Sequence, residues 1–132
     1  RDSIINRAIH RYARRVESLL WEKVGGDLSQ MTPKIIAESA DEGDFEAQEV
    51  LREVGENLGA GIGSMINIFA PDVFAIGGQV VKAGRWLLEP AVREAAKVAI
   101  PTLFCDCRIV PAECGDDAGL LGAAAMAYKL GD

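Results

Sequence analysis

The sequence predicts a helix-rich α/β fold in which a short sheet is covered by helices. Most of the chain carries apolar residues at helical spacing, while only two short apolar runs, at 73–76 and 107–110, have the length of strands. The chain has 132 residues, of which 49% are hydrophobic, and this is enough for one compact core. We therefore expect residues 1–132 to form a single unit.

The N-terminal segment is predicted to be an amphipathic helix over residues 3–23. Gly25 and Gly26 follow it, and glycine commonly ends helices. We expect the arginine face of this helix to be solvated, or to pack on a neighbouring part of the protein, rather than to contact phosphates. The apolar positions are Ile5, Ile9, Tyr12, Val16 and Leu19, and the arginines mostly on the other side are Arg7, Arg11, Arg14 and Arg15.

Two further helices carry start and stop signals. Thr32 and Pro33 form an N-cap and first-turn pair for a short helix over residues 35–40, which Gly43 closes. Asp44 then caps the longest helix, from Phe45 to Phe69, and Pro71 lies just past its end. The apolar stripe of this long helix consists of Val50, Val54, Leu58, Ile62, Met65, Ile66 and Phe69.

Three glycines interrupt the long helix at intervals of four residues. Gly55, Gly59 and Gly63 each cost up to about 1 kcal/mol of helix propensity relative to alanine. Residues four apart share one helix face, so these glycines form a smooth groove where another helix or a strand can approach closely. The groove suits packing within the chain, and it also suits dimerisation, which stays an alternative role for this protein.

The second half of the chain is predicted to alternate strands and helices. Val73–Ile76 has the character of a strand buried on both faces of a parallel sheet. A helix near residues 84–99 contains Pro90, and a second strand follows at 107–110. A last helix at about 118–129 has Asp116 or Asp117 as its cap. Two strands are few for a doubly covered sheet, so we expect the rest upstream in a parent chain or from another copy.

Composition excludes some classes of partner. The net charge of -6 argues against non-specific binding to nucleic acid or an anionic membrane. No apolar run has the length of a membrane span, and we expect a cytoplasmic protein. Cys105, Cys107 and Cys114 are predicted to be reduced thiols, with the first two on one face of a strand. No zinc site is expected from them.

The segment that says most about function begins at the predicted strand 73–76. Gly77 and Gly78 follow the strand directly, and glycines at this edge of an α/β sheet let the backbone approach a ligand closely. A nucleotide site is the physical interpretation of this pattern. A purely structural turn is the alternative, because a glycine pair alone is a weak signal.

Four segments together resemble the C-terminal region of the ROK family of sugar kinases and repressors. They are Gly43-Asp44, Gly55-Glu56-Asn57-Leu58-Gly59, the segment Ile66 to Val80 and the segment Asp117 to Ala124. The resemblance implies part of an actin-like ATPase fold (ribonuclease H-like), namely the C-terminal lobe of a glucokinase-like enzyme. It implies that Gly77 and Gly78 approach the adenosine of ATP, with Gln79 as a flanking backbone contact.

The resemblance also implies what this chain does not supply. The catalytic Asp of ROK kinases, their phosphate-binding loops and their zinc motif lie upstream of the matching region. No catalytic or metal-binding residue is therefore assigned, and the chain alone is expected to be inactive. In a complete protein, ATP, Mg²⁺, a sugar and a homo-oligomeric partner are implied; the effector and oligomerisation domain of a sugar-responsive transcriptional repressor is the alternative.

Overall fold

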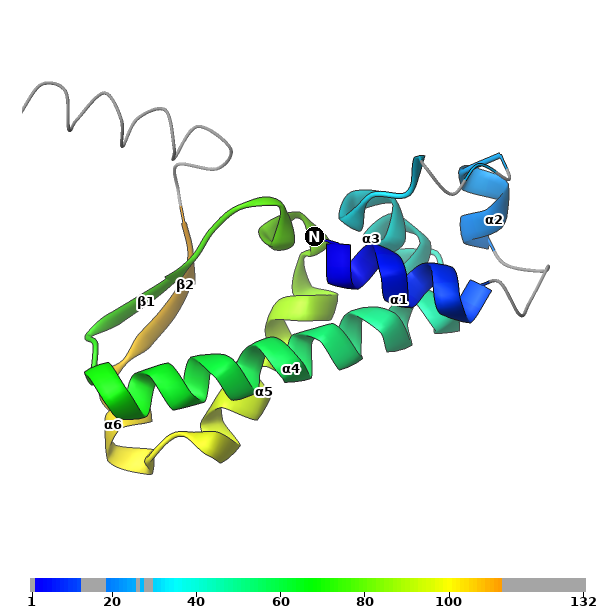
Figure 1. Cartoon of the computed structure of the whole chain (residues 1–132). Coiled ribbons are helices and arrows are strands. Elements are labelled where there is room, and N and C mark those ends of the chain that lie inside the picture. Colours follow the sequence, from blue (N-terminus) through cyan, green and yellow to red (C-terminus); the bar gives the residue numbers. More distant parts are fainter. Residues whose placement is uncertain (1, 13–18, 26, 28–29, 113–132) are drawn as a thin grey trace, which may run out of the picture.

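The computed structural model describes residues 2–12, 19–25, 27 and 30–112. A long helix and a second helix run side by side, with a small sheet near one end and the N-terminal helices near the other (Figure 1). The elements are, in order, α1 (Asp2–Tyr12), α2 (Leu19–Lys23), α3 (Pro33–Asp41), α4 (Phe45–Phe69), β1 (Val73–Ile76), the 3-10 helix η2 (Gln79–Ala83), α5 (Arg85–Val98), α6 (Pro101–Asp106) and β2 (Arg108–Pro111).

The predicted helix over residues 3–23 is present as two helices, α1 and α2, and residues 13–18 between them lie outside the described part. On the arginine face of α1, Arg7 forms an ion pair of 3.0 Å with Glu53 of α4. Gly25, at φ 58°, ends α2 as expected. Ile4 and Ala8 of α1 are buried in the core.

The predicted N-caps at Thr32 and Asp44 are confirmed. The backbone N–H of Ile35 donates to Thr32 Oγ1 at 3.2 Å, and the N–H of Ala47 donates to Asp44 Oδ1 at 3.1 Å. Each bond satisfies a donor that the first helical turn leaves without a partner. The bounds Phe45–Phe69 agree with the prediction, and Gly43, at φ 97°, forms the turn between the two helices.

The glycine groove of α4 is filled by α5 of the same chain. A Cβ atom added at Gly55 would overlap the carbonyl of Leu87, and one added at Gly63 would lie 2.8 Å from the Val98 Cβ. Because α5 occupies the groove, the role of the groove is packing inside the chain. A dimer interface on this face of α4 is excluded, which corrects that part of the dimerisation hypothesis.

Two apolar clusters lie along the α4 and α5 pair. The first contains Ile36, Val50 and Leu87, and the second contains Ile62 and Ile66 with Ile76 of β1. The predicted stripe of α4 is therefore correct for most of its positions. It is wrong for Met65 and Phe69, whose exposed fractions are 49% and 72%.

Asn67 joins the end of α4 to the end of α5. Its Nδ2 donates to the Val98 carbonyl at 3.1 Å, and its Oδ1 accepts from the Ile100 N–H at 2.7 Å. Replacing Asn67 with alanine is expected to lower the free energy of unfolding by about 1–2 kcal/mol, since two hydrogen bonds to backbone are lost. Urea unfolding followed by circular dichroism measures this change.

Asn57 provides the matched control for Asn67. It lies on the same helix, but its Nδ2 donates to the Glu53 carbonyl one turn back, so it joins no second element. Asn57→Ala is expected to change stability by less than about 0.5 kcal/mol. Equal losses of unfolding free energy in the two variants would show that the link between α4 and α5 contributes nothing to stability.

The two strands pair in parallel, with Val73 opposite Arg108 and Ile76 opposite Pro111. The parallel arrangement agrees with the prediction. The prediction that the strand at 73–76 is buried on both faces is wrong. Val73 and Ala75 are exposed, and in the described part of the chain β1 has β2 as its single strand neighbour. One edge of β1 therefore carries no strand within the described residues.

The segment before β2 differs from the prediction. Residues 101–106 form α6, with Pro101 in its first turn, so Cys105 is an exposed helical residue. Cys107, in contrast, is buried just before β2, and both thiols are free. The prediction that the two cysteines share one strand face is thus wrong. Cys114, Asp116, Asp117 and the predicted helix at 118–129 lie outside the described residues.

Candidate functional site

The predicted glycine pair lies directly after the carboxyl end of β1. Gly78 has φ 77°, a conformation that glycine adopts without steric cost, and its backbone is exposed. A Cβ atom added at Gly77 would have the Ala112 Cβ, at 3.6 Å, as its nearest contact. Gln79 begins η2, and the Gly78 carbonyl accepts from the Val81 N–H at 3.2 Å. The backbone of this turn is thus open on its outer side.

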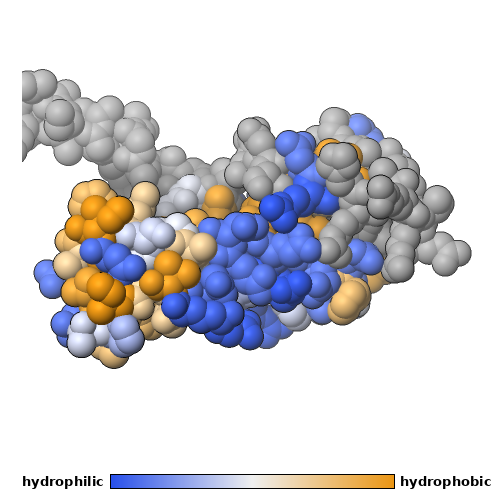
Figure 2. All heavy atoms as spheres, turned by 60° about the horizontal axis from the view of Figure 1, so that its bottom comes forward, coloured by the Kyte–Doolittle hydropathy of each residue, from blue (hydrophilic) through white to orange (hydrophobic). Residues whose placement is uncertain are grey.

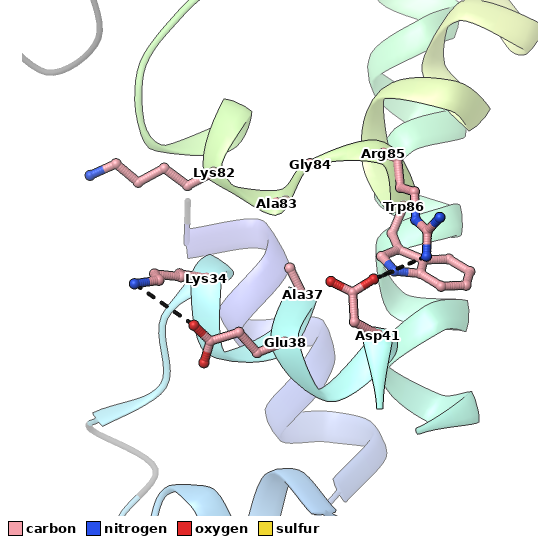
Figure 3. Close-up of a pocket in the computed structure, with 9 residues that line it drawn as sticks. All are labelled: Lys34, Ala37, Glu38, Asp41, Lys82, Ala83, Gly84, Arg85 and Trp86. Carbon is pink, nitrogen blue, oxygen red and sulfur yellow. Dashed lines mark hydrogen bonds and ion pairs between the residues drawn. The ribbon is translucent and has the colours of Figure 1, made fainter. Parts of the chain in front are cut away.

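A pocket of about 660 Å³ lies beside η2. One wall is α3 and the other is the end of η2 and the start of α5, as Figure 3 shows. The side chains of Lys34 and Lys82 extend to the same side of the pocket, and Lys34 Nζ lies 3.7 Å from Glu38 Oε1. The residues that line it are Lys34, Ala37, Glu38, Asp41, Lys82, Ala83, Gly84, Arg85 and Trp86.

Asp41 holds the two walls of this pocket together. Its Oδ1 accepts from Trp86 Nε1 at 2.8 Å and from the Arg85 guanidinium at 3.2 Å. The Arg85 guanidinium also lies over the Trp86 ring, 5.1 Å from its centroid, in cation–π geometry. The pocket therefore has a half-buried aromatic wall whose orientation is fixed by a carboxylate from α3.

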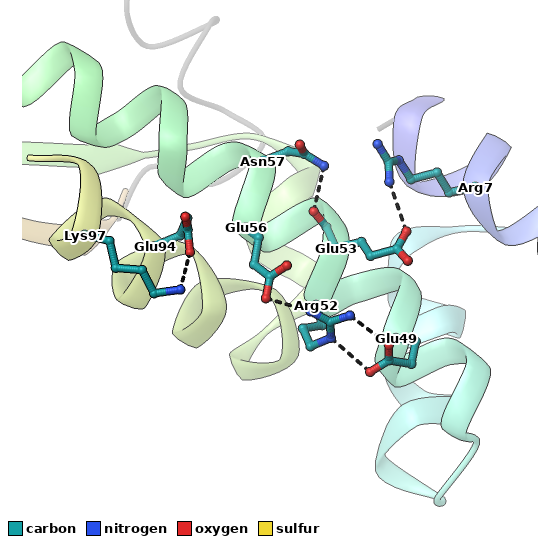
Figure 4. A network of polar contacts seen from close by, with 8 residues as sticks. All are labelled: Arg7, Glu49, Arg52, Glu53, Glu56, Asn57, Glu94 and Lys97. Carbon is teal, nitrogen blue, oxygen red and sulfur yellow. Dashed lines mark hydrogen bonds and ion pairs between the residues drawn. The ribbon is translucent and has the colours of Figure 1, made fainter.

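Trp86 also lines a second pocket, together with Glu49 and Arg52 of α4. Figure 4 shows the ion pairs of this part of α4. Arg52 donates to Glu49 at 2.8 Å and to Glu56 at 2.7 Å, one turn away in either direction on α4. The hydrogen bonds that Arg52 donates, first to Glu49 and then to Glu56, raise its pKa above the usual value. Because these charges satisfy one another on a solvated helix face, they stabilise α4 modestly and offer no reactive group.

The residues predicted from the sequence are not among those that line the pocket, but they lie directly before η2 or at its start. Gly77, Gly78 and Gln79 are contiguous and lead into η2, whose last residues line the pocket. The α3 wall was not predicted, and Asp41, which orients Trp86, is the last residue of that short helix.

A sequence model described as the ROK family matches residues 3–129. The chain belongs to the ROK family. It is 28% identical over 123 residues to the glucokinase of Thermotoga maritima, and this match covers 90% of the chain and 39% of that protein. It is also 33% identical over 103 residues to the N-acetylglucosamine repressor of Escherichia coli O6:H1, covering 77% of the chain and 25% of the repressor.

A solved ROK structure supports the same fold. The ROK family glucokinase from Streptomyces griseus, in complex with glucose and AMPPNP, is 28% identical with a TM-score of 0.81, over 95% of this chain and 41% of that one. The predicted fold class is confirmed, since ROK sugar kinases have an actin-like ATPase fold. The chain spans about two fifths of the length of these ROK kinases.

The described residues offer neither a metal site nor a membrane-spanning helix. Within residues 2–12, 19–25, 27 and 30–112, no three His, Cys, Asp or Glu side chains gather closely enough to hold a metal ion. No helix in this part of the chain is both long and apolar enough to cross a bilayer.

Proposed function

We propose that this ROK chain forms the adenosine side of the nucleotide cleft in an ATP-dependent, glucokinase-like sugar kinase. The observation that carries the proposal is the open backbone of Gly77 and Gly78 at the carboxyl end of β1, where ligands of α/β sheets bind. Gln79, as the first residue of η2, adds a flanking backbone contact. The Streptomyces griseus relative was solved with AMPPNP, an ATP analogue, and this supports a nucleotide as the ligand.

The pocket between α3 and η2 is the space that we assign to the nucleoside. Its volume, about 660 Å³, is within the usual range for small-molecule sites. The half-buried Trp86 offers an apolar surface to a planar base, while Glu38 and Lys34 offer polar groups at the α3 wall.

Phosphoryl transfer needs more than this surface. A base must accept the proton of the sugar hydroxyl, Mg²⁺ must neutralise the phosphates, and the cleft must exclude water. We assign none of these roles to residues of this chain, and the sugar and Mg²⁺ belong to a complete protein. The chain alone is thus expected to bind ATP weakly and without turnover, because a half-site leaves most contacts unmade.

A second candidate function is the effector and oligomerisation domain of a sugar-responsive repressor. This candidate is supported by the 33% identity, over 103 residues, to the N-acetylglucosamine repressor of Escherichia coli O6:H1. A repressor needs no phosphoryl donor, so this candidate predicts no affinity for ATP. We also propose a homo-oligomer and a cytoplasmic location for either function.

Replacing Gly77 with alanine is expected to weaken ATP binding about tenfold, which corresponds to about 1.4 kcal/mol. The added methyl group would stand between the backbone and the nucleotide. It should leave the fold intact, because its nearest neighbour would be the Ala112 Cβ at 3.6 Å, an ordinary van der Waals contact. Calorimetric titration with ATP and Mg²⁺ measures the affinity, and a coupled assay with glucose on the same sample measures turnover.

Gly61→Ala is the matched control, because Gly61 lies on α4, outside the turn, and a Cβ atom added there meets nothing within 4 Å. Its ATP affinity is expected to equal that of the wild type. If the Gly77→Ala variant bound ATP as tightly as the wild type, Gly77 would not belong to the nucleotide site. A complete absence of ATP binding would favour the repressor domain, and turnover by the chain alone would show that it supplies a catalytic base.

A further inference from the structure

Asp41 uses one of its two carboxylate oxygens within the chain. Its Oδ1 accepts from Trp86 Nε1 at 2.8 Å and from the Arg85 guanidinium at 3.2 Å. Its Oδ2 has no hydrogen-bond partner among the described residues, and Figure 3 shows this second oxygen turned away from the two donors. Because Asp41 lines the pocket between α3 and η2, Oδ2 keeps its capacity to accept a hydrogen bond from a ligand there.

Trp86 is an aromatic residue in polar surroundings. The apolar side chains with the largest exposed fractions, Ile68 and Phe69, belong to the C-terminal end of α4. Figure 2 shows apolar surface gathered at one end of the molecule and a hydrophilic band along its middle. The charged residues that line the pocket with Trp86 are Lys34, Glu38, Asp41, Lys82 and Arg85. An aromatic side chain among charged groups suits a small, planar and polar ligand rather than another polypeptide.

The contact with Asp41 orders the indole before a ligand arrives. Trp86 is half-buried, and the hydrogen bond to Asp41 holds its Nε1 edge toward α3. Arg85 adds a second restraint, since its guanidinium lies 5.1 Å from the centroid of the ring. Ordering a side chain at the moment of binding lowers affinity, and a side chain that is already ordered avoids this loss. Asp41 can thus act on a ligand through Trp86 as well as directly.

A nucleotide matches this arrangement. It combines a planar base, which packs on an indole ring, with hydrogen-bond donors on the ribose and, in adenine, on the 6-amino group. Acidic side chains accept from ribose hydroxyls in other nucleotide sites. The pocket also has Lys34, Lys82 and Arg85 against Glu38 and Asp41, and this excess of positive charge suits a ligand with phosphates.

We propose that Asp41 is a specificity-determining residue of this pocket. Its Oδ1 positions Trp86 for the base, and its Oδ2 accepts a hydrogen bond from a donor group of the nucleoside. A ribose hydroxyl and the 6-amino group of adenine share this chemistry, and analogues of ATP distinguish them. The inference rests on the proposed nucleotide function and adds to it the group that selects the ligand.

Titrations of the complete 132-residue chain with nucleotides and Mg²⁺ test the direct contact. Three analogues each lack one candidate donor: 2′-deoxy-ATP and 3′-deoxy-ATP lack a ribose hydroxyl, and inosine triphosphate has a carbonyl in place of the 6-amino group. The wild type is expected to bind one of them about tenfold more weakly than ATP, because a hydrogen bond to a charged group is lost. The analogue that shows the loss identifies the donor.

Asp41→Asn separates the two roles of Asp41. Its amide oxygen still accepts from Trp86 and Arg85, and because both of these groups are donors, the NH₂ group has to take the place of Oδ2. This variant should bind ATP about tenfold more weakly than the wild type and show no further loss with the analogue that identifies the donor. A merely structural role would lower the affinity for every nucleotide equally. Asp41→Ala also releases Trp86 and is expected to bind ATP more weakly still.

Fluorescence reports the position of Trp86 without any ligand. The chain has two tryptophans, so Trp21→Phe leaves Trp86 as the single source of emission. In this background Asp41→Ala is expected to shift the emission to the red, because the indole gains contact with water, whereas Asp41→Asn should match the unchanged Asp41. Circular dichroism checks that each variant is folded.

Glu42→Ala is the matched control. Glu42 directly follows Asp41 and forms an ion pair of 2.7 Å with Lys23, but it does not line the pocket. Its removal should change neither the emission of Trp86 nor the affinity for ATP. An equal loss of ATP affinity in Glu42→Ala and Asp41→Ala would overturn the inference, because negative charge at the end of α3 would then be sufficient to explain it.

The remaining outcomes distinguish this inference from the proposed function. A wild-type chain without affinity for any of the nucleotides would overturn both. A wild-type chain that binds ATP and all three analogues equally would overturn the inference alone, since Oδ2 would then accept from none of the candidate donors. Unchanged emission in Asp41→Ala would likewise overturn the positioning of Trp86 by Asp41 and leave the nucleotide site in place.

Discussion

Replacing Gly59 with alanine is expected to lower the free energy of unfolding by about 3 kcal/mol, near the upper end of overpacking effects. A Cβ atom at this position would overlap the Ala91 carbonyl oxygen and lie 2.8 Å from the Glu94 Cβ. Ala91 is fully buried, so α5 has to shift along its length to make room. The gain of about 1 kcal/mol in helix propensity offsets only part of this cost.

Urea unfolding followed by circular dichroism measures the loss, and α4 itself provides the control. Gly61 lies two residues away on the open side of the helix, where an added Cβ atom meets nothing within 4 Å. Gly61→Ala is expected to raise stability by about 1 kcal/mol through helix propensity alone. If Gly59→Ala stabilised the chain as Gly61→Ala does, close packing of α4 against α5 would not be the reason for glycine at position 59.

Leu87→Ala is expected to cost about 2–5 kcal/mol, the usual range for truncating a fully buried leucine. Leu87 is fully buried in the first cluster, where α5 meets α3 and α4. The loss combines the transfer free energy of the removed atoms with a cavity that two packed helices cannot close. Thermal unfolding should shift to a clearly lower temperature.

Val92→Ala serves as the comparison for Leu87→Ala. Val92 lies on the same helix, but 37% of its side chain is exposed, so its truncation is expected to cost less than about 1 kcal/mol. Similar losses at the two positions would contradict the assignment of Leu87 to the core.

Features that depend on neighbouring residues were predictable from the sequence. The caps at Thr32 and Asp44 are set by contacts three residues apart, so a short pattern suffices to identify them. The glycine spacing of α4 predicted close approach of another element. It could not say that the element is α5, since which helix fills a groove is decided by the whole fold.

Other features were beyond the reach of local patterns. Met65 and Phe69 belong to the apolar stripe of α4, but a stripe does not reveal how much of its length the rest of the chain covers. Helix α6 has only six residues, too few for a periodic signal, so Cys105 and Cys107 were assigned to a strand. Pro101 in the first helical turn was the available cue.

The candidate site was likewise half predictable. Gly77 and Gly78 stand out because glycine after an apolar strand has a physical meaning in any α/β protein. The α3 wall has no such signature, because the bond between Asp41 and Trp86 joins residues 45 positions apart. Charged residues at the end of a short helix are ordinary, and only the folded chain brings them against an aromatic ring.

The close seam between α4 and α5 has a mechanical consequence. At a rise of about 1.5 Å per residue, the 25-residue helix α4 is about 37 Å long, and α5 is locked against it by backbone contacts at three glycines. The pair therefore acts as a rigid strut that runs past both apolar clusters. Any domain closure in a ROK protein containing this unit would move the strut as one body, so that the hinge has to lie elsewhere.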